Sequence, residues 1–323
     1  MKKELLLTFE ITDACQNKCK HCHAESGYRT TQVDSKTIKK VIDEFSQLYE
    51  KGRIRLSGGE PTLHKDLIEL IRYINYSTNL TKTDISTNCQ KIAINEDYLL
   101  ALKEAGLKSI ATSLFGIKEE HDSFTERKGS FEEIIETSYK CLKHDLKVVW
   151  NIFAHKKNKD EIGDIIEMGE DIGIDRVQVL PFGLYGRGSK ISDLRLSLEE
   201  KDKLVSSHPE VARSLRYCSE SDIIPVLNEV CCLNWSMDFF KIKTNLDVYP
   251  CCYPEQNENY LLGNLRERSV KEVIASKPLI VRLVKEKGFE SFADINPAIK
   301  YSIREEPCEA CHKWVKAYDL RNK

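Results

Sequence analysis

The 323-residue sequence lacks the features that would place the chain in a membrane, outside the cell or on nucleic acid. It has no apolar run close to the roughly 20 residues that a membrane-spanning helix needs. Its formal net charge is −2, so no long-range field favours nucleic acid or an anionic membrane. Acidic residues interrupt the short apolar N-terminal stretch and no small-residue cleavage site follows, which argues against a signal peptide. We expect a cytoplasmic protein that binds neither nucleic acid nor membranes.

The sequence also lacks internal repeats and low-complexity tracts, and an alternation of two kinds of segment fills its first half. Apolar runs of strand length are followed by longer amphipathic stretches. Strands are expected at 4–11, 53–57, 83–87, 107–115, 146–154 and 175–182, and helices at 35–50, 64–76, 96–105, 130–144 and 159–171. Strict alternation predicts an α/β fold with a parallel sheet, either an open partial barrel or a doubly wound sheet. In both, ligands bind at the carboxyl ends of the strands.

Cysteine, in contrast, is plentiful, with 12 residues in the chain. Clustered thiols in a cytoplasmic enzyme more often bind metal or act in catalysis than form disulfides. Cys15, Cys19 and Cys22 follow the first expected strand with the spacing C-x3-C-x2-C. Structural zinc takes four protein ligands, whereas a 4Fe–4S cluster held by three cysteines leaves one iron open. His21 and His23 could complete a zinc site, but neighbours this close in sequence rarely surround one ion.

The motifs around these cysteines resemble the radical SAM superfamily. The similar features are the C-x3-C-x2-C loop, "CKHCHA" around its third cysteine, and "LSGGEP" at the end of the second expected strand. The resemblance covers most of residues 1–182 and implies a partial (β/α)6 barrel whose three cysteines bind a 4Fe–4S cluster. It implies that S-adenosylmethionine (SAM) chelates the open iron and is cleaved reductively to a 5′-deoxyadenosyl radical. A protein such as flavodoxin or ferredoxin would be the reductant.

The resemblance also implies a set of SAM contacts at the ends of other strands. Ser57, Gly58, Gly59 and Glu60 would face the methionyl ammonium, and the two glycines allow a close backbone approach that a Cβ would block. Further polar candidates are Asn88, Ser113, Asn151 and Arg187, which could meet the ribose hydroxyls or a carboxylate of SAM or substrate. Cys89 follows Asn88 where relatives often carry glycine, so any backbone role at this position is open.

A second group of cysteines lies in the C-terminal part of the chain. We predict a closed four-thiolate site from Cys232, Cys251, Cys308 and Cys311, with Cys231 as a possible replacement for Cys232. The phrases "DVYPCC" and "LLGNLRERSVKEV" resemble the SPASM extension of radical SAM enzymes and its shortened twitch form, which implies one auxiliary 4Fe–4S cluster. Zinc is the alternative metal here. Leu246 departs from the glycine that relatives commonly carry in the turn before "VYPC".

The resemblance divides the chain into a radical SAM core (1–182), a connecting segment (183–230) and an auxiliary cluster domain (231–323). In radical SAM peptide epimerases, which are similar to this chain in "YPCC", "VRLVKEKGF" and a late C-x2-C, the second cysteine of the pair donates a hydrogen atom. That cysteine corresponds to Cys252, whose S–H bond would be weak enough to quench a carbon radical. The alternative is a packed, non-reactive thiol.

Three functions follow from these observations. The first is hydrogen abstraction from a ribosomally synthesised peptide, ending in epimerisation, oxidation or a crosslink. The second is dehydrogenation of a small aminosugar or aminocyclitol. The third is a non-catalytic iron–sulfur or zinc protein that binds a partner or passes electrons, which the three-cysteine motif disfavours. No separate domain precedes the first strand to capture a leader peptide, which weakens the case for leader-dependent recognition.

Overall fold

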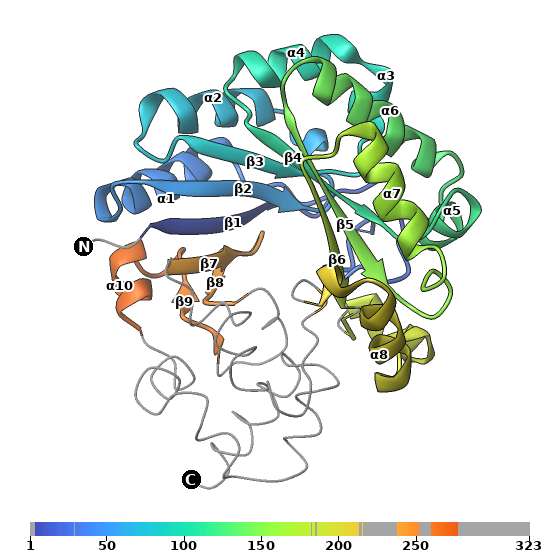
Figure 1. The fold of residues 1–323 in the computed structure, drawn as a ribbon. Helices are drawn as coiled ribbons and strands as arrows, with labels where there is room; N and C mark the ends of the chain where they lie inside the picture. The colour runs from blue at the N-terminus through green and yellow to red at the C-terminus, as the bar shows by residue number, and fades with distance from the viewer. Residues whose placement is uncertain are drawn as a thin grey trace, which may run out of the picture.

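The computed structural model describes residues 4–28, 30–181, 183–184, 186–212, 215, 238–251 and 260–276. Within them, one curved sheet has the strand order β6-β5-β4-β3-β2-β1-β7-β8-β9 (Figure 1). The strands are β1 (Leu5–Thr12), β2 (Gly52–Gly58), β3 (Lys82–Ser86), β4 (Ser109–Leu114), β5 (Lys147–Ala154), β6 (Arg176–Pro181), β7 (Asp238–Ile242), β8 (Asp247–Tyr249) and β9 (Gly263–Asn264). Strands β1 to β6 pair in parallel, which confirms the predicted α/β fold.

Helices cover the convex side of this sheet, so the fold is a partial barrel and not a doubly wound sheet (Figure 1). The α-helices are α1 (Ser35–Leu48), α2 (Leu67–Ser77), α3 (Gln90–Ile94), α4 (Glu96–Glu104), α5 (Glu119–Thr125), α6 (Ser130–Lys143), α7 (Ile162–Ile172), α8 (Leu198–Ser207) and α10 (Val270–Ala275). Short 3-10 turns lie at η1 (Pro61–Leu63), η2 (Gly186–Leu194) and η3 (Pro209–Val211).

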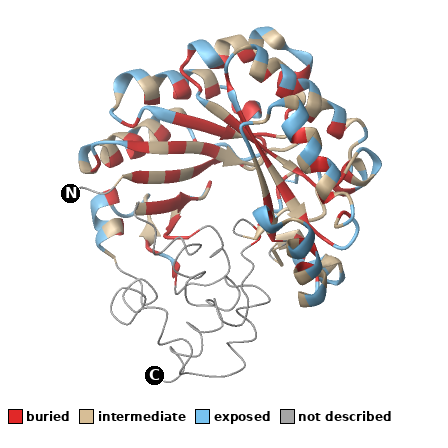
Figure 2. Cartoon of the chain, viewed as in Figure 1, coloured by how far each residue is buried: buried red, intermediate tan, exposed pale blue. Residues whose placement is uncertain are grey.

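Each barrel strand has a mainly apolar outer face and a more polar inner face. In β1, Leu5, Leu7 and Phe9 are completely buried toward the helices. Thr8 and Glu10, which alternate with them, line a cavity inside the barrel. Because side chains alternate along a strand, each strand contributes one face to the core and the other face to the site. Figure 2 shows this burial pattern along the strands and the sheet-facing sides of the helices.

The C-terminal part of the chain extends the barrel sheet. Strand β7 pairs in parallel with β1, and β8 and β9 continue the sheet in antiparallel order. Leu5 of β1 therefore has Gly52 on one side and Asp238 on the other as register partners. None of these three strands was expected from the sequence. They bring residues after 237 to the edge of the cavity described below, where Phe239 and Lys241 line its wall.

Candidate active site

A cavity of about 400 Å³ lies inside the curve of the sheet, a volume within the range of small-molecule binding sites. Most of the residues predicted from the sequence to bind the cluster or SAM line it together. They are Cys15, Cys19, Cys22, Ser57, Gly58, Gly59, Asn88, Ser113 and Arg187. The carboxyl ends of parallel strands meet at one edge of a sheet, so residues at or after the ends of five strands converge here.

The glycine pair of β2 packs directly on the first cysteine loop. A Cβ at Gly58 would lie 2.2 Å from the Thr12 carbonyl oxygen, and one at Gly59 would lie 2.2 Å from the Ala14 carbonyl oxygen. Gly58 also has a φ of 120°, a conformation that residues with side chains rarely adopt. The backbone N–H of Gly59 donates to the Thr12 carbonyl at 2.7 Å. Only glycine therefore lets the two loops approach this closely.

Glu60 supports this corner from behind the cavity wall. Its buried carboxylate accepts hydrogen bonds from the Thr62 backbone N–H (3.1 Å) and hydroxyl (2.6 Å). It also accepts from the Thr87 hydroxyl (2.8 Å) and the Asn88 backbone N–H (2.6 Å). Burial raises the pKa of Glu60, and these hydrogen bonds oppose the shift. The carboxylate thus ties the end of β2 to the end of β3, and a direct contact between Glu60 and SAM stays a prediction.

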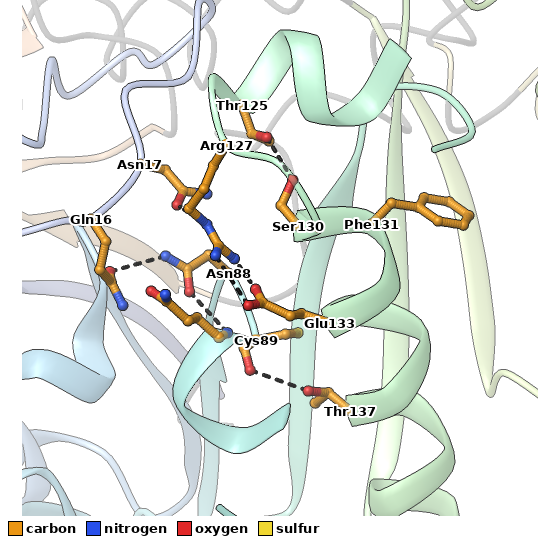
Figure 3. Close-up of polar contacts among 12 residues, drawn as sticks. Gln16, Asn17, Asn88, Cys89, Thr125, Arg127, Ser130, Phe131, Glu133 and Thr137 are labelled. Atoms are coloured by element: carbon orange, nitrogen blue, oxygen red, sulfur yellow. Dashed lines mark hydrogen bonds and ion pairs between the residues drawn. The ribbon is translucent and has the colours of Figure 1, made fainter. Parts of the chain in front are cut away.

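Two side chains hold the cysteine loop from the direction of α6 and β3 (Figure 3). Asn88 donates from its amide nitrogen to the Gln16 side-chain oxygen at 3.1 Å and lies 4.0 Å from the Cys15 sulfur. Arg127 donates from Nε to the Asn17 side-chain oxygen at 2.9 Å, and Glu133 accepts from its Nη1 at 3.0 Å. The residues between Cys15 and Cys19 are therefore anchored on both sides.

Arg187, in η2 after the last barrel strand, holds the other side of the cysteine loop. Its Nε donates to the Cys19 carbonyl at 2.9 Å, and its Nη1 donates to the Ser26 carbonyl at 2.8 Å. Its backbone N–H donates to the Cys22 carbonyl at 3.0 Å. These bonds explain why an arginine after β6 matters to a loop after β1. The predicted pairing of Arg187 with a carboxylate of SAM or substrate stays a prediction.

The three cysteine thiols fit an iron–sulfur cluster better than a single ion. Burial, together with the neighbouring thiols, raises the pKa of Cys15 to about 11 and that of Cys19 to about 12. Metal binding must therefore displace their protons. Among the described residues, no three His, Cys, Asp or Glu side chains converge as ligands of one metal ion would. A 4Fe–4S cluster is bound by thiolates around its periphery, each on its own iron.

An aromatic group forms the wall next to the cysteines. The His21 ring lies 4.3 Å from the Phe115 ring centroid and 5.4 Å from that of Phe153. Burial lowers the pKa of His21 to about 3, so the ring is neutral, and its buried Nδ1 has no hydrogen-bond partner. Sequence reasoning considered His21 only as a zinc ligand. It missed both phenylalanines, although each occupies an inward or strand-end position.

Other predicted residues lie away from the cavity or outside the described residues. Asn151 has the same orientation on β5 as Phe153, but it does not line the cavity. Cys251 is buried just after β8. The remaining predicted auxiliary ligands and the hydrogen donor lie outside the described residues. They are Cys231, Cys232, Cys252, Cys308 and Cys311.

Two family models match the chain. The radical SAM superfamily matches residues 9–169, and an iron–sulfur cluster-binding domain, SPASM, matches residues 231–312. The chain belongs to the radical SAM superfamily. This radical SAM enzyme accordingly uses SAM and a 4Fe–4S cluster, with further iron–sulfur binding in its SPASM domain. No helix in the described part of the chain is long and apolar enough to cross a membrane.

Relatives of this radical SAM enzyme carry different activities. Fe-coproporphyrin III synthase from Methanosarcina barkeri is 32% identical over 66% of this chain, and the chain spans 53% of that relative. A probable GTP 3′,8-cyclase from Saccharolobus islandicus is 24% identical over 88% of this chain and 96% of the relative. PqqA peptide cyclase from Bradyrhizobium diazoefficiens is 26% identical over 76% of this chain and 66% of the relative.

Solved structures support the same fold. Streptococcus suis SuiB bound to S-adenosylmethionine superposes with a TM-score of 0.68 and 16% identity. The match covers 88% of this chain and 68% of SuiB. At this identity the likeness shows the fold alone, and the fold includes the partial barrel predicted from the sequence.

Proposed function

We propose that this radical SAM enzyme abstracts a hydrogen atom from a ribosomally synthesised peptide and thereby modifies it. The observation that carries the proposal is the convergence of the three cysteines and the glycine pair on one cavity inside the barrel. When bound, SAM and the cluster supply the 5′-deoxyadenosyl radical. A peptide substrate is supported by PqqA peptide cyclase among the relatives and by SuiB, which has also been crystallised with its precursor peptide SuiA.

In this proposal, residues at different positions in the cavity bind the cluster and SAM. Cys15, Cys19 and Cys22 hold the cluster, and the backbone of Gly58 and Gly59 accepts the close approach of SAM. The remaining predicted SAM contacts are Ser57, Glu60, Asn88, Ser113, Asn151 and Arg187. Strands line the cavity on one side and the anchored cysteine loop lines it on the other, so the barrel wall would limit the access of water to the radical.

The outcome for the substrate radical depends on the C-terminal part. We propose that Cys232, Cys251, Cys308 and Cys311 hold one auxiliary cluster. Cys252 would return a hydrogen atom to the substrate carbon in an epimerisation. Without that donor, an electron would pass to the auxiliary cluster, and oxidation or a crosslink would result. Heavy water separates these outcomes, since epimerisation adds one deuterium from an exchanged thiol and oxidation removes two hydrogen atoms.

A small-molecule substrate is the second candidate. The similarity to a probable GTP 3′,8-cyclase extends over 96% of that relative, so a small metabolite would also suit the architecture. An aminosugar or aminocyclitol dehydrogenation belongs to this class. The electron donor, a flavodoxin or a ferredoxin, is common to both candidates.

The test is anaerobic reconstitution with iron and sulfide, followed by reaction with dithionite and SAM. We expect 5′-deoxyadenosine from the wild-type chain and none from Cys15→Ala. Cys141→Ala is the matched control, since Cys141 is buried in α6 and should not affect cleavage. Candidate peptides are then turned over in heavy water and weighed by mass spectrometry. A wild-type chain with full iron content that forms no 5′-deoxyadenosine would favour the electron-transfer alternative.

A further inference from the structure

We propose that Arg55 binds an oxyanion group of the substrate, a carboxylate in the case of a peptide, at the floor of the cavity. This inference names the substrate chemistry of the site and rests on the proposed function for the identity of the reaction. It comes from a row of inward-facing residues that the cluster and SAM contacts do not use.

Arg55 lies one step deeper in the barrel than the glycine loop. It precedes Ser57 by two residues on β2, so both side chains point inward, and both line the cavity. Two residues of a strand span about 7 Å, which separates Arg55 from the loop near the cysteines. The resemblance implies that SAM would bind through its amino and carboxylate groups at the loop of Cys15, Cys19 and Cys22. A cation at this depth is therefore placed for a second molecule.

The register of the sheet puts polar partners beside Arg55. Thr8 on β1 is the register partner of both Arg55 on β2 and Lys241 on β7. On the other side, Arg55 is in register with Asp84 on β3. Arg55, Thr8 and Lys241 all line the cavity. A guanidinium, a hydroxyl and an ammonium thus form one row across three neighbouring strands, about 5 Å apart from strand to strand.

Within this row, Arg55 is the donor that the described residues leave unsatisfied. Its guanidinium Nη2 lies 3.6 Å from Asp84 Oδ2, beyond hydrogen-bond distance, and its buried Nε has no hydrogen-bond partner. Asp84 is shared, because Arg53 Nε lies 3.5 Å from the same oxygen and the Ser109 hydroxyl donates to its Oδ1 at 2.6 Å. A buried donor without a partner costs free energy that an incoming acceptor would recover.

The charged side chains around Arg55 also favour an anion. Lys241 is matched by Glu10, whose carboxylate lies 3.0 Å away, so this pair adds no net charge. Arg53, Arg55 and Arg176 face one carboxylate, Asp84. Burial and the positive charges of Arg55 and Arg53 lower the pKa of Arg176. An excess of fixed guanidinium charge inside a barrel attracts an oxyanion, and arginine can bind carboxylate or phosphate with two parallel hydrogen bonds.

The test measures binding without turnover. The reconstituted full chain is saturated with SAM under anaerobic conditions and titrated by calorimetry with three probes. They are N-acetylglutamate N-methylamide, its neutral glutamine counterpart and inorganic phosphate. We expect the wild-type chain to bind the acid about tenfold more tightly than the amide, because the acid gains one pair of charge-assisted hydrogen bonds. Arg55→Gln should abolish this preference, and Arg55→Lys should retain part of it.

Arg53→Gln is the matched control. Arg53 pairs with the same aspartate from the same strand but does not line the cavity, so its loss should change the preference by no more than about threefold. Thr8→Val gives a second variant at the row that keeps the side-chain volume and should weaken binding of the acid. If the wild-type chain binds phosphate more tightly than the acid, and Arg55→Gln abolishes that binding, the same site is supported with phosphate as the source of the oxyanion.

Two results would overturn the inference. One is equal binding of the acid, the amide and phosphate by the wild-type chain. The other is an equal loss of preference in Arg53→Gln and Arg55→Gln, which would indicate a diffuse field instead of a site. Formation of 5′-deoxyadenosine is measured separately, so a failure of the proposed function is distinguishable from a failure of the anion site.

Discussion

Leu246 and Cys89 are two of the six described non-glycine residues with a positive φ. Leu246 and Cys89 both have a φ of 71°, in the left-handed region that costs a side-chain-bearing residue roughly 1–2 kcal/mol. The sequence marks both positions as departures from the glycine of relatives. The structure shows that the backbone requirement persists, since Cys89 initiates α3 with this conformation and accepts a hydrogen bond from the Thr137 hydroxyl (Figure 3).

At Leu246 the strain and the packing oppose each other. Its N–H donates to the Lys243 carbonyl at 2.9 Å in the turn between β7 and β8, and its side chain is buried in the main core. We predict that Leu246→Gly and Leu246→Ala both destabilise the fold, because both remove the buried side chain. Glycine should be less damaging by about 1 kcal/mol, because it alone relieves the backbone strain. Urea unfolding of the three chains measures the difference, and an equal or larger loss in the glycine variant would contradict it.

At the scale of elements, the barrel strands and long helices are predictable and the short or distant elements are not. Strands β1 to β6 each fall within about two residues of their expected bounds, since apolar runs of strand length encode them locally. Helices α3, α5 and α10 were missed because each has fewer than eight residues. Helix α8 was missed although Ser197 and Glu200 form a capping box at its start. Strand β7 was missed because its partner β1 lies more than 200 residues earlier in the chain.

The end of β4 depends on two neutral histidines that contact one residue. His121 accepts the Phe115 backbone N–H at Nδ1 (3.3 Å), and His155 donates from Nε2 to the Phe115 carbonyl (2.9 Å). Burial lowers the pKa of each histidine to about 4. An unfolded histidine titrates near 6.5, so between pH 6.5 and 4 the unfolded chain binds more protons. The fold therefore loses stability as the pH falls through this range.

We predict that His121→Asn flattens this pH dependence. The asparagine oxygen can accept the Phe115 N–H in place of Nδ1, but it cannot be protonated. The free energy of unfolding should then fall by about 3 kcal/mol less between pH 7 and pH 4 than in the wild-type chain, since 2.5 pKa units are removed from the linkage. Urea titrations at several pH values measure this. Parallel curves for the two chains would show that His121 is not protonated on unfolding.

At the scale of the whole molecule, sequence motifs revealed the rim of the site and missed its floor. The cysteines and the glycine pair belong to motifs with fixed spacing, Arg187 follows the last barrel strand, and the structure brings them together. Arg55 and Lys241 carry no motif, because their role depends on which face of a strand points inward and on the pairing of β7 with β1. The alternation of charged and apolar residues in "RIRLS" was the one local signal for Arg55.

The sheet joins the barrel to a C-terminal part that is expected to hold its own cluster. Because Cys251 follows β8 and the cysteine loop follows β1, the two predicted metal sites arise from strands of one sheet but share no ligand. We predict that the triple variant Cys15→Ala, Cys19→Ala and Cys22→Ala keeps the auxiliary cluster. Its iron content after anaerobic reconstitution should fall from about eight to about four atoms per chain, and its cleavage of SAM should cease.

Cys141→Ala serves as the control for this measurement and should keep the full iron content, because Cys141 is buried against the core in α6. Combining the triple variant with Cys251→Ala should remove the remaining iron. A triple variant with no iron at all would mean that the auxiliary site cannot assemble without the first cluster, and the two metal sites would then have to be treated as one folding unit.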